Sequence, residues 1–591
     1  MSSTFAATPQ FRRRRLKALA VAAADHAPWL VDLYRGLAHP SWEAAIWQDF
    51  LTTHRALGWM RALPDPPEEA PRVLVVLRRE DVFDVKSSLM QGAAMKLQGV
   101  RPVVLAQHRR VPRIHRYARA FGVSDLRFRS EVRASTAALC EIGKRVDELM
   151  ARPDDFAATR SWTYGGFPLG ERVLSTLIRE TFDGDPDLER PDHRSRLERI
   201  LRLALTHYVQ AETILDSVEP RWVLADETGY AVNGPLVDVA LARGLDVIET
   251  SPYLREGALI FKRMNGSVGR TVSTSVARET LEFLERRPWT ADREAELQAE
   301  LVGRYAGSTA LQRMYQWNTQ DLGREEICAE HSLDPERPLV VVFSHVLWDA
   351  SFFYGEDLFA NYGEWLERTV AAAAASPQAN WLIKAHPANA FRLSHGDVSG
   401  PVAEVEVVRR RMQRLPDHVK LLLPETPVSS LALYRHADAG VTVRGTAGLE
   451  MACFGKPVIT AGSGHYSGLG FTIDSATTEE YLARLDHIER FTEPLPEVAR
   501  VRARRYAYTL FKLRPWVGRS FEVVLDYPEQ GWHPLDRNVI ARARSLEEAQ
   551  RHGDLDRWAD WSVNQRTADY LEDFEKGGAG TCSAAARGEA R

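Results

Sequence analysis

The chain has 591 residues, of which 45% are hydrophobic and 26% are charged, and its formal net charge is −4. This length predicts two or more domains with ample core, and so small a net charge gives no indication of a nucleic-acid partner. No apolar run approaches the roughly 18 to 20 residues that a membrane span needs. The four cysteines lie far apart and form no CxxC or Cys/His cluster. Their spacing argues against a structural zinc site and a disulfide framework, and it favours the reducing cytoplasm.

Residues 1–70 are predicted to be helical and end in the breaker-rich run Pro64-Asp65-Pro66-Pro67. Four arginines at 12–15 precede an apolar run at 16–24, an order that resembles a signal peptide. The apolar run is only about two and a half turns of helix long, and no clear cleavage site follows it. We therefore interpret it as part of an ordinary amphipathic helix.

A first α/β unit is predicted for residues 71–270. Short apolar runs separated by helical patterns are expected to be its strands: 73–77, 102–106, 126–128, 222–225 and 246–249. Long helical patterns at 131–151 and 192–216 form an insert, with an irregular stretch between them. Residues 271–335 are polar and helical, and they are expected to link this unit to the next.

The clearest alternation of strands and helices lies in residues 336–490. The expected strands are 339–343, 381–383, 419–423, 439–443 and 458–461, a pattern that predicts a parallel, doubly wound sheet. Residues 491–576 are expected to be helices, with 494–516 crossing back to the first unit, and 577–591 to be disordered. The predicted fold class is α/β, with two Rossmann-like domains facing a cleft and helical additions at both ends.

Several polar residues fall at the carboxyl ends of the strands in the second unit, where ligands of such sheets bind. Arg444-Gly445-Thr446 stands between a strand and a helix, so backbone N–H groups, a hydroxyl and a guanidinium could hold a phosphate there. The alternative is an ordinary helix cap. His345 opens an aromatic loop that could cover a base or a sugar, or simply pack.

A second group of candidates follows the next strands. Pro387 biases His386 toward extended backbone, so the imidazole would project from the strand tip as a donor or an acid-base group. Lys384 lies on the same strand face and indicates an anion nearby. Ser429 and Ser430 offer hydroxyls at a third strand end, unless they are ordinary helix-start residues.

Asp226 and Glu227 form the only paired carboxylate at a strand tip of the first unit that faces the expected cleft. A carboxylate at this place can deprotonate an acceptor hydroxyl, and helix capping by Asp226 is the alternative. Two basic stretches also occur, and neither resembles a nucleic-acid module. The one at 500–519 is interleaved with aromatic residues, a composition that suits a membrane surface as well as a solvated helix.

These residues together resemble the capsule polysaccharide biosynthesis family and, more widely, two-domain (GT-B type) glycosyltransferases. The resemblance covers 338–461 and, more loosely, 160–265, including the run from Tyr164 to Gly170. Gly448-Leu449-Glu450 followed by Gly455-Lys456-Pro457 is similar to a pattern of many donor domains, which places Glu450 among the candidate binding residues.

In related transferases that use CMP-linked sialic acid or Kdo, an acidic pair followed by Gly supplies the base. A His-Pro motif contacts the nucleotide, and a Ser/Thr motif binds its phosphate. The resemblance implies Asp226-Glu227 as the acidic pair, although Thr228 stands before Gly229 here, and it implies His386-Pro387 at the nucleotide. Either Ser429-Ser430 or Gly445-Thr446 would bind the phosphate.

The resemblance implies a cytoplasmic glycosyltransferase of surface or capsular polysaccharide biosynthesis, with a peripheral membrane contact through 500–519 as a further expectation. Its donor would be a nucleotide sugar, with CMP favoured, and its acceptor a glycan or a lipid-linked glycan. No metal would be required, because His386, Lys384 and a helix N-terminus would supply positive charge. Two alternatives stay open: a CDP-polyol phosphate transferase of the teichoic-acid type that uses His345 and His386, and a non-catalytic GT-B-like assembly protein.

Overall fold

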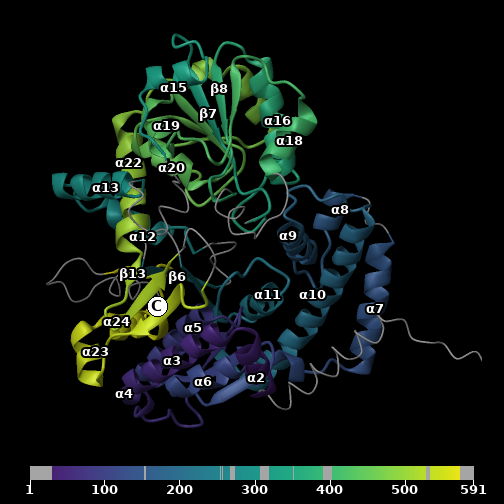
Figure 1. Ribbon diagram of the computed structural model, residues 1–591, viewed down its shortest axis with the longest axis vertical. Helices are drawn as coiled ribbons and strands as arrows, with labels where there is room; N and C mark the ends of the chain where they lie inside the picture. Colours follow the sequence, from purple (N-terminus) through teal and green to yellow (C-terminus); the bar gives the residue numbers. More distant parts are fainter. Residues whose placement is uncertain are drawn as a thin grey trace, which may run out of the picture.

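The computed structural model describes residues 29–151, 155–252, 255, 257–265, 273–305, 319–349, 352–389, 402–526 and 533–572. The apolar run at 16–24 and the tail at 577–591 lie outside these residues. The chain forms two α/β domains, which lie one above the other in Figure 1, with the second domain at the top.

The first domain is built on a seven-stranded sheet with the order β13-β6-β5-β4-β1-β2-β3. The strands from β5 to β3 in that order are parallel, whereas β6 is antiparallel to β5 and β13 is antiparallel to β6. The strand bounds are β1 Arg72–Val76, β2 Arg101–Ala106, β3 Asp125–Phe128, β4 Pro220–Ala225, β5 Asp246–Ser251, β6 Ala258–Met264 and β13 Trp516–Val517.

Helices cover both faces of this sheet because successive residues of a strand point to opposite faces and both faces are apolar. In β1, Val73 and Val75 belong to one core, and Leu74 and Val76 belong to the other. The first core is covered by α3 Pro40–Ala56, α5 Val82–Met95, α6 Pro112–Ala120 and α24 Asp554–Val563. The second is covered by α7 Thr136–Met150, α9 Leu169–Thr181, α10 Pro191–Val218 and α11 Gly234–Ala242.

The second domain is built on a six-stranded sheet with the order β12-β11-β10-β7-β8-β9, and all of its strand pairs are parallel. Its strands are β7 Leu339–Phe343, β8 Asn380–Lys384, β9 Val419–Leu422, β10 Ala439–Thr442, β11 Val458–Thr460 and β12 Ile473–Asp474. Its helices are α16 Tyr362–Ala375, α18 Ala403–Arg411, α19 Ser430–His436, α20 Thr446–Cys453 and α21 Thr478–Asp486.

Both sheets follow one winding order, in which the strand that comes first in the domain lies in the middle. The chain turns from one half of the sheet to the other between β1 and β4 in the first domain, and between β7 and β10 in the second. These are the topological switch points, where ligands of open α/β sheets bind. The predicted fold class, two Rossmann-like doubly wound domains of GT-B type with helical additions, is confirmed.

The remaining helices extend or connect the two domains (Figure 1). At the N-terminal end of the described chain these are α2 Trp29–Ala38 and α4 Gly58–Arg61, and α8 Phe156–Arg160 belongs to the helical insert of the first domain. The connecting segment contains α12 Arg278–Glu285, α13 Ala291–Gly303 and α15 Arg324–Glu330. Short 3-10 turns are Lys96–Gln98, Arg129–Glu131 and Ile488–Phe491.

The C-terminal segment returns from the second domain to the first. Helix α22 Glu497–Tyr508 ends in a π-helical turn, Thr509–Leu513, and β13 then pairs with β6 so that Trp516 stands opposite Leu259. A hairpin of β14 Phe521–Leu525 and β15 Arg537–Ala541 follows, and then α23 Leu546–His552 and α24. In Figure 1 these yellow elements lie beside the purple N-terminal helices.

Two predictions about these segments are wrong. Residues 491–576 are not only helices, because the alternating burial of Phe521, Val523 and Leu525 belongs to a strand whose period is two. Strand β6 was also not expected, because Lys262 and Arg263 interrupt its apolar pattern; both are buried, where Asp569 and Asp246 pair with them. A charged residue in a central strand is tolerated when a partner is buried with it.

Candidate active site

The candidate site lies where the carboxyl edges of the two sheets approach each other. The loop after β7 reaches the first domain, since Asp357 pairs with Arg160 of α8 at 3.1 Å and the Asn361 amide donates to Asp185 at 2.8 Å. Ligands of such sheets bind beyond the carboxyl ends of the strands. Residues from both switch points can therefore act on one bound molecule.

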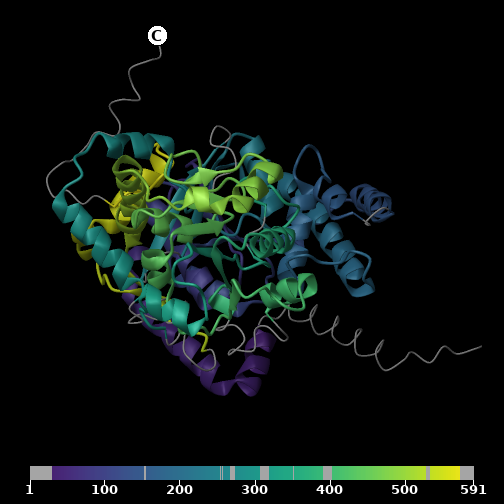
Figure 2. The same ribbon diagram turned by 90° about the horizontal axis from the view of Figure 1, so that it is seen from above.

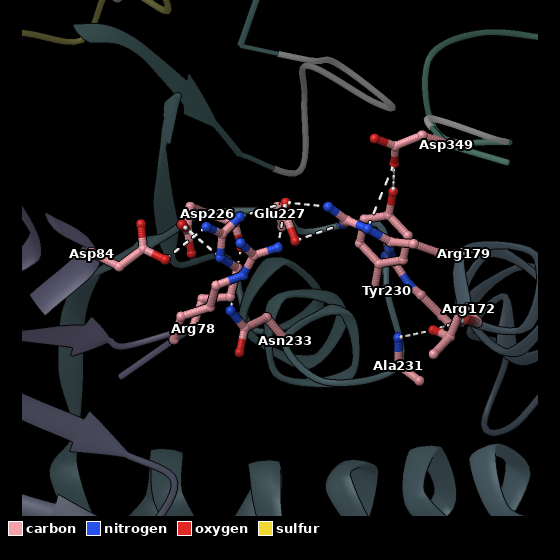
Figure 3. A network of polar contacts seen from close by, with 12 residues as sticks. Arg78, Asp84, Arg172, Arg179, Asp226, Glu227, Tyr230, Ala231, Asn233 and Asp349 are labelled. Carbon is pink, nitrogen blue, oxygen red and sulfur yellow. Dashed lines mark hydrogen bonds and ion pairs between the residues drawn. The ribbon is translucent and has the colours of Figure 1, made fainter. Parts of the chain in front are cut away.

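Three carboxylates of the first domain surround the guanidinium of Arg78, which lies two residues after β1. Its Nη2 is 2.7 Å from Asp84 Oδ2 of α5, its Nε is 3.3 Å from Asp226 Oδ2, and its Nη1 pairs with Glu227. Figure 3 shows the carboxylates of Asp84, Asp226 and Glu227 around this guanidinium. Asp226 and Glu227 follow β4, so the predicted acidic pair lies at the first switch point.

Glu227 is held as a charged group. Its two carboxylate oxygens accept from the two terminal nitrogens of Arg179 at 2.8 and 2.9 Å, in the planar fork that guanidinium and carboxylate form best. Burial alone would raise the pKa of Glu227, but Arg78 and Arg179 outweigh it and lower the pKa. Its backbone φ of 43° lies in the left-handed region, so the tight turn after β4 fixes the direction of this side chain.

Asp226 has the opposite electrostatic environment. Burial raises the pKa of its carboxyl group to about 7; Arg78 opposes this shift, whereas the charges of Asp84 and Glu227 add to it. A carboxyl group that titrates near neutrality can accept and release a proton at physiological pH. Of the two acidic residues, Asp226 is the one suited to act as a base.

The acidic pair is connected to the second domain through Arg179 of α9. The guanidinium that holds Glu227 also lies 3.9 Å from Asp349, in the loop after β7, and the Tyr230 hydroxyl donates to the same carboxylate. Figure 3 shows this path from Glu227 through Arg179 to Asp349. The position of the second-domain loop therefore influences the charges around the predicted base.

His345 lies at the second switch point, between β7 and β10. Its Nε2 accepts from the backbone N–H of Arg444 at 3.1 Å, and its ring stacks on Tyr362 with 4.7 Å between ring centroids. Burial, together with the positive charges of Arg444 and His386, lowers the pKa of His345 to about 3. The imidazole is therefore neutral and fixes the two strand ends to each other.

Arg444 follows β10, and its guanidinium is buried. Its Nη2 donates to the Glu356 carbonyl at 3.2 Å and pairs with Asp357, whereas Nε and Nη1 have no hydrogen-bond partner among the described residues. Gly445 is the N-cap residue of α20, and Thr446 is its first residue. Unsatisfied guanidinium N–H groups close to a helix N-terminus suit an oxyanion, as predicted for this turn.

His386 and Pro387 follow β8, the strand beside β7. The His386 backbone N–H donates to Glu404 at 3.3 Å, and its ring Nδ1 accepts from the N–H of Ala388 at 3.2 Å, so in the neutral ring Nε2 carries the proton. Burial raises the pKa of Glu404 to about 7. The turn after β8 thus holds the imidazole in one tautomer with a donor nitrogen.

Lys384 is the last residue of β8, and the two candidate serines follow β9, one strand farther from the second switch point. Lys384 is buried, its Nζ donates to the Val428 carbonyl at 3.1 Å, and burial lowers its pKa to about 8. The Ser429 hydroxyl accepts from the N–H of Ala432 at 2.9 Å, and Ser430 is buried in the first turn of α19. Ser429 is therefore a helix cap, which was the alternative interpretation.

Glu450 lies in a buried polar cluster with the connecting segment. Its carboxylate is 3.5 Å from Arg304 and accepts from Tyr305, and burial raises its pKa. Of the predicted second-domain residues, the structure brings His345, Arg444, Gly445 and Thr446 together at one switch point, with His386 and Pro387 on the adjacent strand end. Glu450 belongs to a separate cluster.

Sequence reasoning did not identify Arg78, Arg179 and Asp349, the residues that set the charges around the acidic pair. Arg78 could have been predicted as a site residue, because it follows a predicted strand just as Asp226 does. Arg179 lies in α9, where the sequence pattern predicts an irregular stretch, and its partners come from the turn after β4 and from the second domain. Such contacts depend on tertiary structure alone.

The segment 500–519 does not provide the basic, aromatic surface that its composition suggested. Its aromatic side chains are buried: Tyr506, Tyr508, Phe511 and Trp516. Six of its seven basic side chains contact carboxylates or backbone carbonyls: Arg500, Arg502, Arg504, Arg505, Lys512 and Arg514. The alternation of aromatic and basic residues instead comes from a helix packed between both domains and the connecting segment.

No helix in the described ranges is long and apolar enough to cross a membrane. In the same part of the chain, no group of three or more His, Cys, Asp and Glu side chains is placed to hold a metal ion.

Residues 295–502 match a family model described as capsule polysaccharide biosynthesis protein. This segment contains the second sheet, most of the connecting helix α13 and the first half of α22. The resemblance found in the sequence is therefore confirmed. A search of the curated proteins found no match.

Among solved structures, the chain is similar to Thermosulfurimonas dismutans KpsC, beta Kdo 2,7 transferase, at 15% identity over 58% of this chain and 88% of that chain, with a TM-score of 0.30. It is similar to the calicheamicin glycosyltransferase CalG4 at 13% identity over 75% and 94%, with a TM-score of 0.23. UDP-GlcNAc 2-epimerase from Neisseria meningitidis matches at 9% identity over 75% and 97%, with a TM-score of 0.24. These likenesses are too distant to carry an argument about function.

Proposed function

We propose, from the match of residues 295–502 to the capsule polysaccharide biosynthesis family, that the protein is a glycosyltransferase of surface polysaccharide assembly. It would transfer a sugar from a nucleotide-activated donor, with CMP favoured, to a glycan or a lipid-linked glycan. The observation that carries the proposal is that each domain contributes one suitable group at the carboxyl end of a strand. A carboxyl group that titrates near neutrality ends β4 of one sheet, and a buried guanidinium with unsatisfied N–H groups ends β10 of the other.

In the proposed reaction, Asp226 takes the proton of an acceptor hydroxyl, and the oxygen forms a bond with the anomeric carbon of the donor sugar. The bond from that carbon to the phosphate oxygen breaks, and the nucleotide leaves with the electron pair. Arg444 and the N-terminus of α20 stabilise the negative charge that develops on the phosphate. His386, with its Nε2 proton, donates to the nucleotide. Holding donor and acceptor in line supplies much of the rate.

The test is a thermal-shift screen of the full chain against CMP, CDP, UDP and GDP. A ligand that binds only the native state stabilises it by RT ln(1 + [L]/Kd), about 2.7 kcal/mol at a hundredfold excess over Kd. We expect a shift with CMP. A shift with CDP alone would favour the polyol-phosphate transferase, and no shift with any nucleotide would favour the non-catalytic assembly protein.

The matched variants for this screen are His386→Ala and His386→Asn. Asparagine keeps a short acceptor for the N–H of Ala388 and so retains the turn after β8, while both variants lose the imidazole donor. We expect both to lose the nucleotide shift and to lower turnover about 10²-fold or more. Near-wild-type turnover in the Asn variant would contradict the role of His386 as a donor to the nucleotide.

We also propose that the protein meets the membrane through α2 and α3 instead of 500–519. Four large side chains there are exposed: Tyr34 by 71%, Leu37 by 77%, Trp42 by 40% and Trp47 by 47%. The Arg116 guanidinium lies 4.7 Å from the centroid of the Trp47 ring.

Exposed aromatic and aliphatic residues beside arginines suit an anionic lipid surface. We expect co-flotation with vesicles rich in phosphatidylglycerol; equal flotation of a Trp42→Ala/Trp47→Ala variant would contradict this.

A further inference from the structure

The loop after β7 places aromatic side chains of the second domain in the first domain. Trp348 and Phe352 belong to a core of the first domain, and they are only 3% and 1% exposed. Phe352 has a backbone φ of 66°, in the left-handed region that a bulky residue rarely adopts. Such a conformation persists only where the surrounding structure imposes it, and it is concentrated at functional sites. The docked loop therefore fixes the place of the next residue, Phe353.

The ring of Phe353 lies against the turn that carries the acidic pair. Gly229, two residues after Glu227, is buried, and a Cβ atom added to it would lie only 2.9 Å from Cδ2 of this ring. The backbone of Gly229 is not in the left-handed region, so the position requires the absence of a side chain and not the conformational freedom of glycine. Gly229 therefore leaves the space that the Phe353 ring fills.

The same ring covers the guanidinium of Arg172, a residue of α9. The central carbon of the guanidinium lies 4.0 Å from the centroid of the ring, well inside the range of a cation–π contact. At its edge, the guanidinium donates to Asp238 from Nε at 3.0 Å and to the Thr228 carbonyl from Nη1. The Arg172 side chain is only 6% exposed, so water competes little for these contacts. Phe353 thus acts on the turn twice, at Gly229 directly and at Thr228 through Arg172.

Groups of the first domain hold the neighbouring residues of this turn. The Thr228 hydroxyl donates to the Glu249 carboxylate at 3.1 Å, and the Ala231 N–H donates to the Thr176 hydroxyl at 3.0 Å. Gly229 has no side chain with which to make a contact of this kind, and the ring from the other domain packs on it instead. The turn that carries the acidic pair is therefore completed by the second domain.

The position of this turn matters for the proposed base. A general base must lie within hydrogen-bond reach of the hydroxyl that it deprotonates, and a displacement of about 1 Å can lower the rate about 10²-fold. Asp226 precedes Gly229 by three residues in the same turn. A turn that moves at Gly229 would move the carboxyl group of Asp226 with it.

We propose that Phe353 is a positioning residue, which fixes the turn at 226–231 and thereby the base Asp226. It acts from the second domain, by packing on Gly229 and on Arg172. The inference rests on the proposed glycosyltransferase function, which it deepens by naming a residue of the donor-binding domain that positions the base. Since the donor binds to the same domain, one docked arrangement of the loop places donor and base together.

The test is a double-variant cycle, measured by hydrogen–deuterium exchange and mass spectrometry on the full chain without ligand. Gly229→Ala adds the methyl group that the ring excludes, and Phe353→Ala removes the ring. Each single variant should raise the amide exchange rate of the peptide that covers 226–231 about tenfold, the change to which a desolvated cation–π contact corresponds. The double variant should exchange no faster than Phe353→Ala, because the added methyl group then meets no ring.

Gly143→Ala in α7 is the matched control, since a Cβ atom added there has no atom within 4 Å outside its own helix backbone. It should leave the exchange at 226–231 unchanged. Unchanged exchange of this peptide in Phe353→Ala, or additive increases in the double variant, would overturn the inference. A rise spread evenly over the first domain would also overturn it, because it would show a general role in packing.

With an active donor, Phe353→Ala should lower kcat about 10²-fold and leave the thermal shift with CMP unchanged, because His386 and Arg444 keep their places. An unchanged kcat would overturn the inference. A failure of the proposed function looks different. The wild-type protein would then show no shift with any nucleotide, while the exchange cycle would still decide whether Phe353 holds the turn.

Discussion

Asp226 and Glu227 are adjacent in the sequence, but their carboxyl groups have different electrostatic environments. Glu227 is held by a guanidinium on each side, whereas Asp226 has one contact to Arg78, at 3.3 Å, and two neighbouring carboxylates. When the pKa values of two neighbouring carboxyl groups are shifted in opposite directions, the two groups are suited to different roles in acid-base catalysis. Glu227 stays ionised, whereas Asp226 can bind and release a proton.

The first prediction concerns the pH dependence of activity. Because the base must be unprotonated and the pKa of Asp226 is about 7, kcat/KM should rise with pH through about 7 and then level off. Asp226→Asn should lower kcat by about 10²- to 10⁴-fold and remove this rise. Steady-state kinetics between pH 5.5 and 8.5 measure both. Glu227→Gln is the control, and the rise near pH 7 should disappear in the Asp226 variant only.

The second prediction concerns stability. The folded pKa of Asp226 is raised above its unfolded value near 3.8, so the native state binds more protons, and this stabilisation is lost as pH rises from about 4 through 7. Asp226→Asn should therefore be more stable than the wild type at pH 8, by at most about 4 kcal/mol, and should gain less than half as much at pH 5. Thermal unfolding at both pH values measures this; a variant destabilised equally at both would contradict it.

At the scale of elements, the loop after β7 connects the two domains through one buried acid. Asp357 pairs with Arg444, which ends β10, and with Arg160 of α8, which in turn lies 3.4 Å from Glu171 of α9. The side chains of Arg444 and Asp357 are only 4% and 7% exposed, whereas that of Arg160 is 21% exposed. Asp357 is thus the central member of a charged chain across the domain boundary.

The third prediction follows from this unequal burial. Asp357→Ala leaves the buried guanidinium of Arg444 without a carboxylate and should cost about 3 to 5 kcal/mol. Arg160→Ala leaves that inner pair intact and should cost about 1 kcal/mol. Urea unfolding measures both. Glu497→Ala, which breaks an exposed pair with Arg500, should change stability by less than about 0.5 kcal/mol. An equal loss of unfolding free energy in Asp357→Ala and Arg160→Ala would contradict the central role of Asp357 among these charged residues.

Elements with a clean pattern could be predicted from the sequence, and those whose pattern depends on distant partners could not. The strands of the second domain read as apolar runs because helices cover both of their faces. Strand β6 was missed because Lys262 and Arg263 interrupt its apolar pattern, and the partner that neutralises Lys262, Asp569, lies 307 residues farther along the chain. In the site, Asp226 and His386 could be placed because strand ends are predictable. The partners of Glu227, which decide its charge, could not.

At the scale of the whole molecule, the C-terminal segment is part of the first domain. Trp516, Phe521 and Trp558 belong to the same core as β1 and α5. Asp569 pairs with Lys262 of β6 at 2.7 Å and accepts from the N–H of Ala277 in the connecting segment at 2.7 Å. Figure 2 shows the yellow C-terminal elements and the teal connecting helices on the same side of the molecule. The first domain is therefore assembled from both ends of the described chain.

The fourth prediction is that the first domain does not fold stably when the C-terminal segment is removed. A chain ending at Leu513 loses β13, the hairpin and α24, which together with Trp516 complete one core. We expect aggregation, or trypsin cleavage within 72–264 under conditions where the full chain resists. A chain ending at Glu572 is the control and should behave like the full protein. Resistance of the shorter chain would contradict the shared core.

This return of the chain has a consequence for synthesis on the ribosome. Residues 72–264 emerge early, yet the edge strand β13 and the helix that closes their core emerge some 250 residues later. Meanwhile β6, paired on one side only, presents an open edge to other nascent chains. The second domain contains its whole sheet in one continuous stretch and can fold during this interval. We expect the C-terminal half to acquire its structure first, and the N-terminal half to wait for the end of translation.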